Sequence, residues 1–375
     1  MTKDKSIAVK MSTGIPLAIP WLTKTEIDFA NEALNSSWIS SKGKFIDEIE
    51  KSSYFTGRDG NILVANGTLA LVLALETLIG RKGSNVLVPN HTFAATANSV
   101  VQSNNLPIFY PQKIASTSIE PDYDSIEKLL CMHSIAALIV VHLYGECVDL
   151  TKARRFCEKY ELILIEDCAE APFSKDIHGN QSGSVGHAAA FSFFANKVIT
   201  SGEGGLVSFK NEHDQQCARQ IRDHGMSPLK KYYHTSYGSN YRMTNVQAAI
   251  LYGQLTRLDS IILQRKTVLE SYCDNLPREK GFIMPRTQEG SVASPWFCVF
   301  ALNREFYHMM GRYDNLLIQK QVEFRHLFEA LVTQPAFQSY PRFSIEDDMI
   351  RGYMLPMHHN LNEAIIKSIC ECFID

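Results

Sequence analysis

The stretch AAAFSFFANKVITSGEGGLVSF, residues 188–209, bears most directly on the fold of this chain. An apolar run at 188–194 is typical of a strand, and it leads through Lys197 and the glycine-rich turn 201–205 to a second apolar strand at 206–209. A lysine usually keeps its ammonium group in water, whereas the flanks of Lys197 are typical of buried core. Burial lowers the pKa of an amine, and a neutral amine can form a Schiff base with an aldehyde. The alternative, which is commoner for lysines in general, is a surface residue on a loop between strands.

The composition is that of a globular protein with no sign of a nucleic-acid or membrane partner. The 375 residues are 45% hydrophobic and 21% charged, with a net charge of -3, and a chain of this length predicts a large core with a smaller second unit. The sequence has no basic stripe, no apolar run of membrane-spanning length and no signal-peptide core. Nine scattered cysteines form no Cys-x-x-Cys pair, so we expect a reducing cytoplasm and neither a disulfide framework nor a zinc site.

Short apolar runs alternate with helical stretches between about residues 60 and 210. The runs are continuously apolar, as expected for strands that helices cover on both faces. This alternation predicts an α/β domain built on a mostly parallel sheet. The expected strands are 61–65, 86–89, 107–110, 136–142 and 162–166, and the expected helices are 69–79, 94–101 and 151–159.

A long helical pattern begins after Thr244. Its apolar stripe is formed by Leu251, Leu255, Leu258 and Ile262, and we expect this single helix to link the large domain to a smaller C-terminal one. The polar, turn-rich stretch 286–294 predicts a loop.

Polar groups follow several of the predicted strands, where open α/β sheets place their ligand sites. Gly67 and Thr68 lie at a strand-to-helix junction, where Thr68 offers a hydroxyl and an N-cap and the helix start favours an anion. Asp167 ends a buried strand and could keep a heteroaromatic ring nitrogen protonated, although it could also cap a following helix. Phe93 could stack on a planar ring or belong to the core. Ser192 could bind a phosphate or be an ordinary strand serine.

Together these groups indicate one cofactor. An amine for an aldehyde, a carboxylate for a ring nitrogen, a stacking ring and a phosphate cradle match pyridoxal 5'-phosphate (PLP). The adjacent His358 and His359 would face opposite ways on a strand and have no partner at metal-ligand spacing, so we expect no metal site.

At these residues the chain resembles the sugar-nucleotide aminotransferases of the DegT/DnrJ/EryC1/StrS family. FSFFANKVITSGEGG, IEDCAEA, NGTLALVLAL and TFAAT are similar to the family's lysine, aspartate, phosphate and stacking segments. The resemblance assigns the Schiff base to Lys197 and the ring nitrogen to Asp167, with Glu170 beside the ring. It also makes Gly67, Thr68, Phe93 and Ser192 cofactor-binding. GSNYRMTNVQAAI resembles the segment that reaches the neighbouring subunit's phosphate through the residue at Asn240, which implies a homodimer with shared active sites.

The resemblance implies a fold type I PLP-dependent aminotransferase. Its large domain has a mostly parallel seven-stranded sheet between helices, and a smaller α/β domain lies at the C-terminus. We therefore expect an N-terminal segment at 1–25 that contributes to the small domain or to dimer contacts, a PLP-binding domain at 26–250, and a linking helix with the small domain at 251–375.

Within the family, SSWISSKGKFIDEIE (36–50), VHLYGECVDL (141–150) and NYRMTN (240–245) are most similar to GDP-perosamine synthases. This subgroup aminates C4 of GDP-4-keto-6-deoxy-D-mannose with glutamate, for O-antigen or other surface glycans. The likeness makes Trp38, Ser40, Lys42 and Arg325 candidates for substrate binding. Two departures leave the nucleotide and sugar open. Ser239 replaces an aromatic residue, and RHLFEALV at 325–332 keeps the arginine but not the proline and histidine of the segment R-P-x-F-x-P-L-H.

Other functions remain open at this stage. The amino acceptor could be a UDP- or dTDP-linked 4-keto or 3-keto sugar, or the chain could be a non-sugar enzyme of the same fold type. A catalytically silent regulatory paralogue is an alternative of another class, but the set of Lys197, Asp167, Thr68 and Ser192 argues against it. A related subgroup carries histidine in place of the lysine and dehydrates its substrate, so Lys197 favours transamination.

Overall fold

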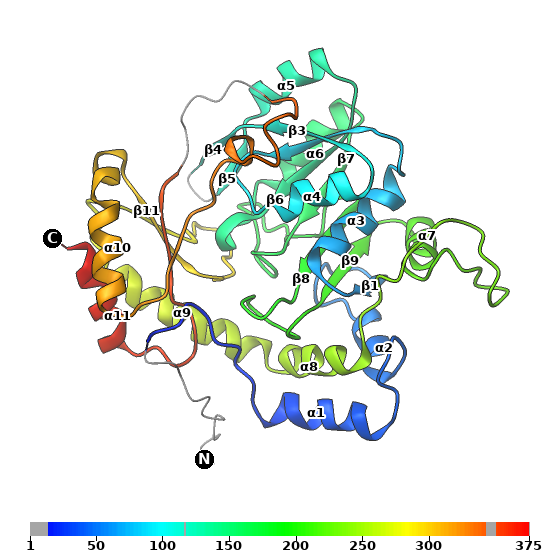
Figure 1. Ribbon diagram of the computed structural model, residues 1–375, viewed down its shortest axis with the longest axis horizontal. Helices are drawn as coiled ribbons and strands as arrows, with labels where there is room; N and C mark the ends of the chain where they lie inside the picture. Colours follow the sequence, from blue (N-terminus) through cyan, green and yellow to red (C-terminus); the bar gives the residue numbers. More distant parts are fainter. Residues whose placement is uncertain (1–13, 116–117, 343–349, 375) are drawn as a thin grey trace.

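The computed structural model describes residues 14–115, 118–342 and 350–374 (Figure 1). Its central element is a seven-stranded sheet. Six of its strands run in the same direction and β9 alone is reversed. The sheet is therefore mostly parallel, and the expected α/β class is confirmed. The strands in sheet order are β1 (Asn61–Val64), β9 (Gly205–Phe209), β8 (Ala188–Ser192), β7 (Ile163–Asp167), β6 (Ile135–Val141), β2 (Asn85–Pro89) and β3 (Leu106–Tyr110).

Helices cover both faces of this sheet, which explains why its strands are apolar on both sides. Apolar side chains of α3 and α4 share one core with residues from one sheet face, and α7 packs against α3, β1 and β9 on that side. On the other face, α5 and α6 pack over one half of the sheet, and α2 and α8, with α1 beside α8, pack over the other half. The helices are α1 (Lys24–Asn35), α2 (Lys44–Glu50), α3 (Gly67–Leu78), α4 (Ala95–Gln102), α5 (Tyr123–Met132), α6 (Leu150–Lys159), α7 (Glu212–Arg222) and α8 (Asn245–Thr256).

The apolar helix α3 begins two residues earlier than expected. Its N-cap is Asn66, whose side-chain oxygen accepts the Leu69 N–H at 2.9 Å. The expectation that Thr68 is the N-cap is therefore wrong, and Thr68 lies in the first turn. Asparagine caps a helix as well as serine or threonine does, so composition alone did not separate Asn66 from Thr68.

The long helix expected after Thr244 is two helices, α8 and α9 (Leu258–Asn275), which break at Arg257. The Arg257 guanidinium donates to Glu26 at 2.6 Å and lies 4.6 Å from the centre of the Trp21 ring. The break rotates α9, so that Ile261 is buried and Ile262 is only partly buried. The prediction of one stripe was wrong because these partners lie about 230 residues away in the sequence.

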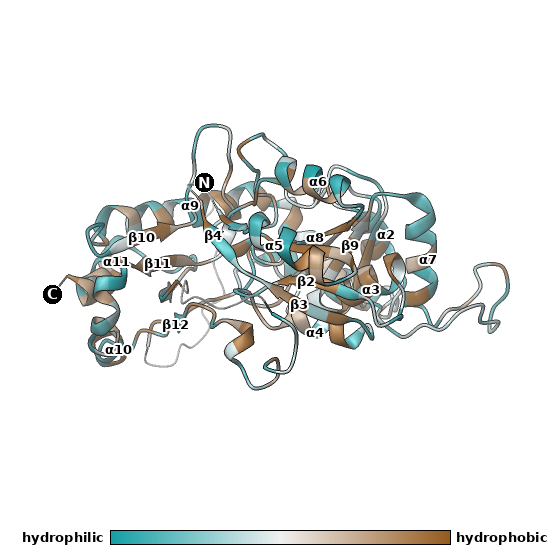
Figure 2. Cartoon of the chain, turned by 90° about the horizontal axis from the view of Figure 1, so that it is seen from above, coloured by the Kyte–Doolittle hydropathy of each residue, from teal (hydrophilic) through white to brown (hydrophobic). Residues whose placement is uncertain are grey.

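A second, fully antiparallel sheet lies beside the first (Figure 2). Residues 14–18 join this part, since Ile15 donates to Gln321 and accepts from Glu323, both at 2.8 Å. The stretch 286–294 is a loop with one isolated bridge, as expected. The domain limits 1–25, 26–250 and 251–375 remain a prediction. The sheet order is β10 (Gly281–Met284), β11 (Cys298–Leu302), β13 (Gly352–Leu355) and β12 (Arg325–His326), accompanied by α10 (Met310–Gln319) and α11 (Glu363–Cys370).

The remaining elements are short. A two-stranded sheet joins β4 (Gln112–Ile114) to β5 (Ile119–Pro121). Short 3-10 helices occur at Leu143–Gly145, Arg304–Met309, Leu331–Thr333 and Glu371–Phe373. Among the residues that the structure describes, no helix has the length and apolar character needed to cross a membrane.

Candidate active site

A cavity of about 1540 Å³ lies between the carboxyl edge of the large sheet and residues of the smaller one. Strands β1, β8, β7, β6 and β2 all end at this edge, because β9 is the only reversed strand of the sheet. The cavity brings together eight of the residues expected from the sequence. These are Gly67, Thr68, Phe93, Asp167, Glu170, Ser192, Lys197 and Arg325.

Lys197 lies on the loop between β8 and β9, and its side chain lines the cavity. Main-chain bonds hold the loop: the Lys197 N–H donates to Phe194 at 2.9 Å, and the Lys197 carbonyl accepts from Arg265 at 3.1 Å. Burial lowers the pKa of the Lys197 amine, while the nearby carboxyls of Glu170 and Asp167 oppose this shift. The interpretation as an ordinary surface lysine is therefore wrong, because the amine sits among carboxyl groups inside the cavity.

Asp167 is the last residue of β7 and is 5% exposed. Its carboxyl accepts the Thr96 hydroxyl at 2.9 Å and the Ala169 N–H at 3.2 Å. Burial raises the pKa of Asp167, and these hydrogen bonds together with Lys197 act in the other direction. No helix follows between 168 and 187, so the interpretation of Asp167 as a helix cap is wrong. A buried carboxyl with a raised pKa is well suited to pair with a cationic ring nitrogen.

Glu170 is buried in the same cavity, where its carboxyl accepts the Tyr144 N–H at 3.1 Å. Burial raises the pKa of Glu170 to about 7, although Lys197 counteracts this. The carboxyl therefore takes up or releases a proton near neutral pH next to the lysine amine.

The raised pKa of Glu170 predicts a pH-dependent stability of the cofactor-free protein. The folded protein binds this proton more tightly than the unfolded chain does, so the stabilisation is complete below the ordinary carboxyl pKa and is lost as the pH rises to about 7. The difference corresponds to about 3 kcal/mol. Between pH 5 and 8, wild type should lose roughly this much unfolding free energy relative to Glu170→Gln in urea titrations. Parallel pH profiles of the two proteins would contradict the expectation.

The start of α3 and Ser192 form the most closely packed part of the cavity. A Cβ atom added at Gly67 would come within 2.7 Å of the Ser192 Cβ, so only glycine fits there. The first N–H groups of a helix are available to an anion, and the Thr68 and Ser192 hydroxyls line the same cavity. This arrangement suits a phosphate group.

Phe93 is 59% exposed on the cavity wall, so it is not a core residue. Its ring centre lies 6.0 Å from that of Phe328, which comes from the segment after β12. A planar ligand could stack on the exposed Phe93 ring.

Tyr144 links the two walls of the cavity, and sequence analysis missed this role. It has a positive φ of 53° and donates its N–H to Glu170, while its hydroxyl accepts the Phe328 N–H at 3.1 Å. The same hydroxyl is hydrogen-bonded to His91 Nε2 at 3.0 Å. No local sequence signal marks a left-handed tyrosine. Thr96 and Trp296, which also line the cavity, were missed because their partners are distant in the chain.

Four other expected residues lie outside this cavity. Trp38, Ser40 and Lys42 are exposed on the loop between α1 and α2, and Asn240 is exposed on the segment before α8. Asn245, the first residue of α8, connects this helix to the loop between α1 and α2. Its side chain donates to the Trp38 carbonyl at 2.7 Å, and its N–H donates to the Ser40 carbonyl. The loop of Trp38 and Ser40 is thus bonded to the start of α8, five residues after Asn240, and none of the four residues lines the cavity of the same chain.

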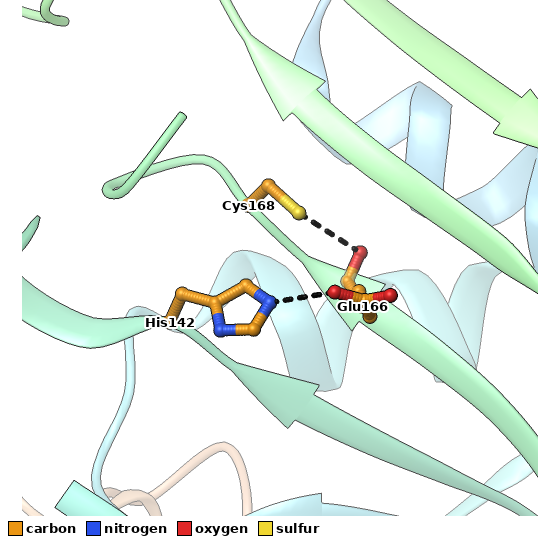
Figure 3. Close-up of side chains that lie close together, drawn as sticks. All are labelled: His142, Glu166 and Cys168. Carbon is orange, nitrogen blue, oxygen red and sulfur yellow. Dashed lines mark hydrogen bonds and ion pairs between the residues drawn. The ribbon is translucent and has the colours of Figure 1, made fainter. Parts of the chain in front are cut away.

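A buried cluster of His142, Glu166 and Cys168 has the donor types of a metal site (Figure 3). Here the Glu166 carboxylate accepts His142 Nε2 at 2.9 Å and three backbone N–H groups of the loop 183–186, and Cys168 Sγ contacts the Glu166 carbonyl. Since these bonds occupy the carboxylate, the cluster acts as a brace for the end of β7. His358 and His359 lie in a bend after β13 and not on a strand, and His359 stacks on Trp21 at 5.2 Å.

The residues of the cavity fit PLP. Burial raises the pKa of Asp167, and a cationic ring nitrogen beside it would stabilise its ionised form. The close approach of Gly67 to Ser192 leaves space at the start of α3 that any larger residue at position 67 would fill. Phe93 presents an exposed ring, and Lys197 presents an amine. The fold and the site together define a PLP-dependent aminotransferase of fold type I.

Comparison with known proteins identifies the family. Residues 20–374 match the DegT/DnrJ/EryC1/StrS aminotransferase family, and the chain belongs to this family of PLP-dependent sugar aminotransferases. It is 33% identical over 365 residues to a GDP-perosamine synthase of Vibrio cholerae, covering 96% of this chain and 98% of that one. It is 37% identical over 367 residues to a GDP-perosamine synthase of Caulobacter vibrioides, covering 95% and 96%.

Solved structures agree with this fold. Spr1654 of Streptococcus pneumoniae in its PLP form has a TM-score of 0.87 at 22% identity, covering 96% of this chain and 97% of that one. Helicobacter pylori PseC, an aminotransferase involved in the biosynthesis of pseudoaminic acid, has a TM-score of 0.86 at 22% identity, covering 96% and 99%. The expected family, fold type, enzyme class and cofactor are confirmed.

Proposed function

We propose that this enzyme transfers an amino group from glutamate to C4 of GDP-4-keto-6-deoxy-D-mannose, and that the product, GDP-perosamine, serves O-antigen or other surface glycan synthesis. The observation that carries the proposal is the nearly full-length similarity to two GDP-perosamine synthases, combined with the lysine-bearing cavity. The reducing cytoplasm expected from the cysteine pattern is part of the same proposal.

The residues of the cavity have complementary roles in this proposal. When bound, PLP supplies an electron sink for the carbon that loses its proton. Lys197 Nζ first holds the cofactor and, once released, takes a proton from the donor carbon and returns it on the cofactor side. Asp167, oriented by Thr96, keeps the pyridine nitrogen protonated. Gly67, Thr68 and Ser192 hold the phosphate.

Arg325 is the candidate for nucleotide recognition within the same chain. It lies on β12 at the cavity wall, with an exposed guanidinium 3.3 Å from Glu323. A guanidinium at this position can pair with a diphosphate. His326, Leu327, Phe328 and Glu329, which belong to the segment that departs from the perosamine synthase pattern, line the same cavity and are placed to influence the choice of sugar.

The substrate is tested with the purified enzyme, glutamate and a panel of GDP-, UDP- and dTDP-linked keto sugars, read by mass spectrometry. The proposal expects the GDP-linked 4-keto-6-deoxy sugar to gain an amine. Amination of only UDP- or dTDP-linked sugars would overturn the GDP assignment. Failure of every sugar with every amino donor, by a protein that binds PLP, would favour the silent paralogue.

We further propose a homodimer with shared active sites. The segment between α7 and α8 projects from the body in both views (Figures 1 and 2) and exposes Leu229, Tyr232 and Tyr237 by 87–96%. An arm that exposes several large side chains of this kind is typical of an interaction surface. Asn240 lies on this segment, and the group of Trp38, Ser40 and Lys42 is joined to it through Asn245, which would place them at the partner's cavity.

Hybrid dimers test this sharing. Lys197→Ala and Asn240→Ala protomers should each be impaired alone, because each lacks one residue of the composite site. After subunit exchange, half of the dimers are hybrids with one intact site, so roughly a quarter of wild-type activity should return. An inactive mixture despite exchange shown by native mass spectrometry would exclude Asn240 from a shared site.

A further inference from the structure

Trp296 lies directly against the amine of Lys197. The Lys197 Nζ atom is 4.0 Å from the centre of the Trp296 ring. Trp296 is 4% exposed and precedes β11, so it reaches the lysine from the second sheet. The motifs that identify the cofactor site do not include it.

The position of the indole ring is fixed relative to the lysine backbone. Its Nε1–H donates to the carbonyl of Asn196, the residue before the lysine, at 3.0 Å. The buried guanidinium of Arg265 donates to the carbonyls of Trp296 and Lys197, at 2.9 and 3.1 Å. Phe297 packs against the ring at 4.5 Å. Because its Nε1–H and the main-chain carbonyl of Trp296 are both hydrogen-bonded, the ring has a defined orientation toward the amine.

An ammonium is attracted by the face of an indole ring, whereas a neutral amine is not. The ring therefore favours the protonated form of a lysine whose burial favours the neutral form. The other ionisable groups that act on this amine are Glu170, from the segment after β7, and Asp167, the last residue of β7. Glu203, from the lysine loop, and Glu323, Arg325, His326 and Glu329, from the second-sheet side, line the same cavity.

We propose that Trp296 is a positioning residue that holds Lys197 against its indole face whenever the lysine is protonated and not bonded to the cofactor. This inference rests on the proposed role of Lys197 as the residue that bonds PLP. Once the freed amine has taken the proton from the donor carbon, such a site keeps the resulting ammonium in place, outside the space that the substrate occupies, until the proton is returned.

The test is the pKa of the Lys197 amine in the full-length, cofactor-free protein. Acetic anhydride reacts only with neutral amines, so mass-spectrometric quantification of Lys197 acetylation against pH gives the midpoint. Trp296→Leu should lower this midpoint by about one pH unit, while Trp296→Phe, which keeps a ring, should lower it less. Trp21→Leu is the matched control, because Trp21 packs on Arg257 and His359, and it should leave the midpoint unchanged.

The sign of the shift separates two roles of Trp296. If the ring only excludes water, Trp296→Leu admits solvent and raises the midpoint toward the ordinary lysine value, which would overturn the proposal. An unchanged midpoint in a variant that retains its circular dichroism spectrum would overturn it as well. Borohydride reduction of the PLP-loaded enzyme, followed by peptide mapping, tests the proposed function separately. Cofactor on another lysine would refute the role of Lys197 without altering the measured effect of Trp296.

Discussion

Lys197→Ala is expected to lower the rate of transamination by about 10⁴-fold or more. The substitution removes in one step the amine that holds the cofactor and the base that moves the proton. Among the lysines of the described residues, Lys197 alone lines the large cavity together with Asp167 and Glu170, so no other lysine is placed to replace it. Product formation by mass and the near-visible absorbance band of lysine-bound PLP measure the two losses independently.

Two further variants show which property of Lys197 matters. Lys197→Arg keeps a cation in the cavity, but a guanidinium remains protonated and is a poor nucleophile, so it should be as inactive as the alanine variant. Lys210→Ala, at an exposed position after β9, should retain both activity and colour. A wild-type protein that stays colourless when saturated with PLP, or an alanine variant with a normal rate, would refute the assignment.

The second large effect is expected at Asp167. Asp167→Ala should reduce the rate by about 10³-fold, because a buried carboxylate no longer faces the ring nitrogen where charge is stabilised. Asp167→Asn should bind PLP better than the alanine variant but remain slow, since an amide can still accept the Thr96 hydroxyl yet carries no charge. Steady-state rates and PLP titrations by absorbance separate rate from affinity.

Thr96→Val is the control for orientation at this carboxyl. It removes one hydrogen bond from a hydroxyl to the Asp167 carboxylate and should lower the rate only about tenfold, because the charge itself is kept. Equal rates for wild type and Asp167→Asn at saturating PLP would show that the carboxylate charge plays no part in the reaction.

Much of the large sheet could be predicted from the sequence, because its strands are apolar on both faces and glycine or polar residues mark their ends. The position of the site could be predicted for the same reason. Parallel strands bring their carboxyl ends to one edge, so Gly67, Asp167 and Ser192 had to meet if the sheet was right.

The remaining features depend on contacts between residues far apart in the sequence. The break at Arg257 requires Glu26, and the orientation of Trp296 requires Asn196 and Arg265. Exposure of Trp38, Ser40, Lys42 and Asn240 outside the cavity cannot be read from one chain, since their proposed place is on a partner. Neither propensity nor periodicity encodes such pairings, because both describe only neighbours along the chain.

Arg265 has a consequence for how the protein loses its activity. This single side chain of α9 donates hydrogen bonds to main-chain carbonyls of the lysine loop and of the segment before β11. The lysine loop and that segment are therefore expected to unfold together. Heat or denaturant that melts the second sheet also frees the lysine, and we expect inactivation to coincide with melting of that sheet. The lysine loop and the small sheet thus form one cooperative unit, although more than 70 residues separate them along the chain.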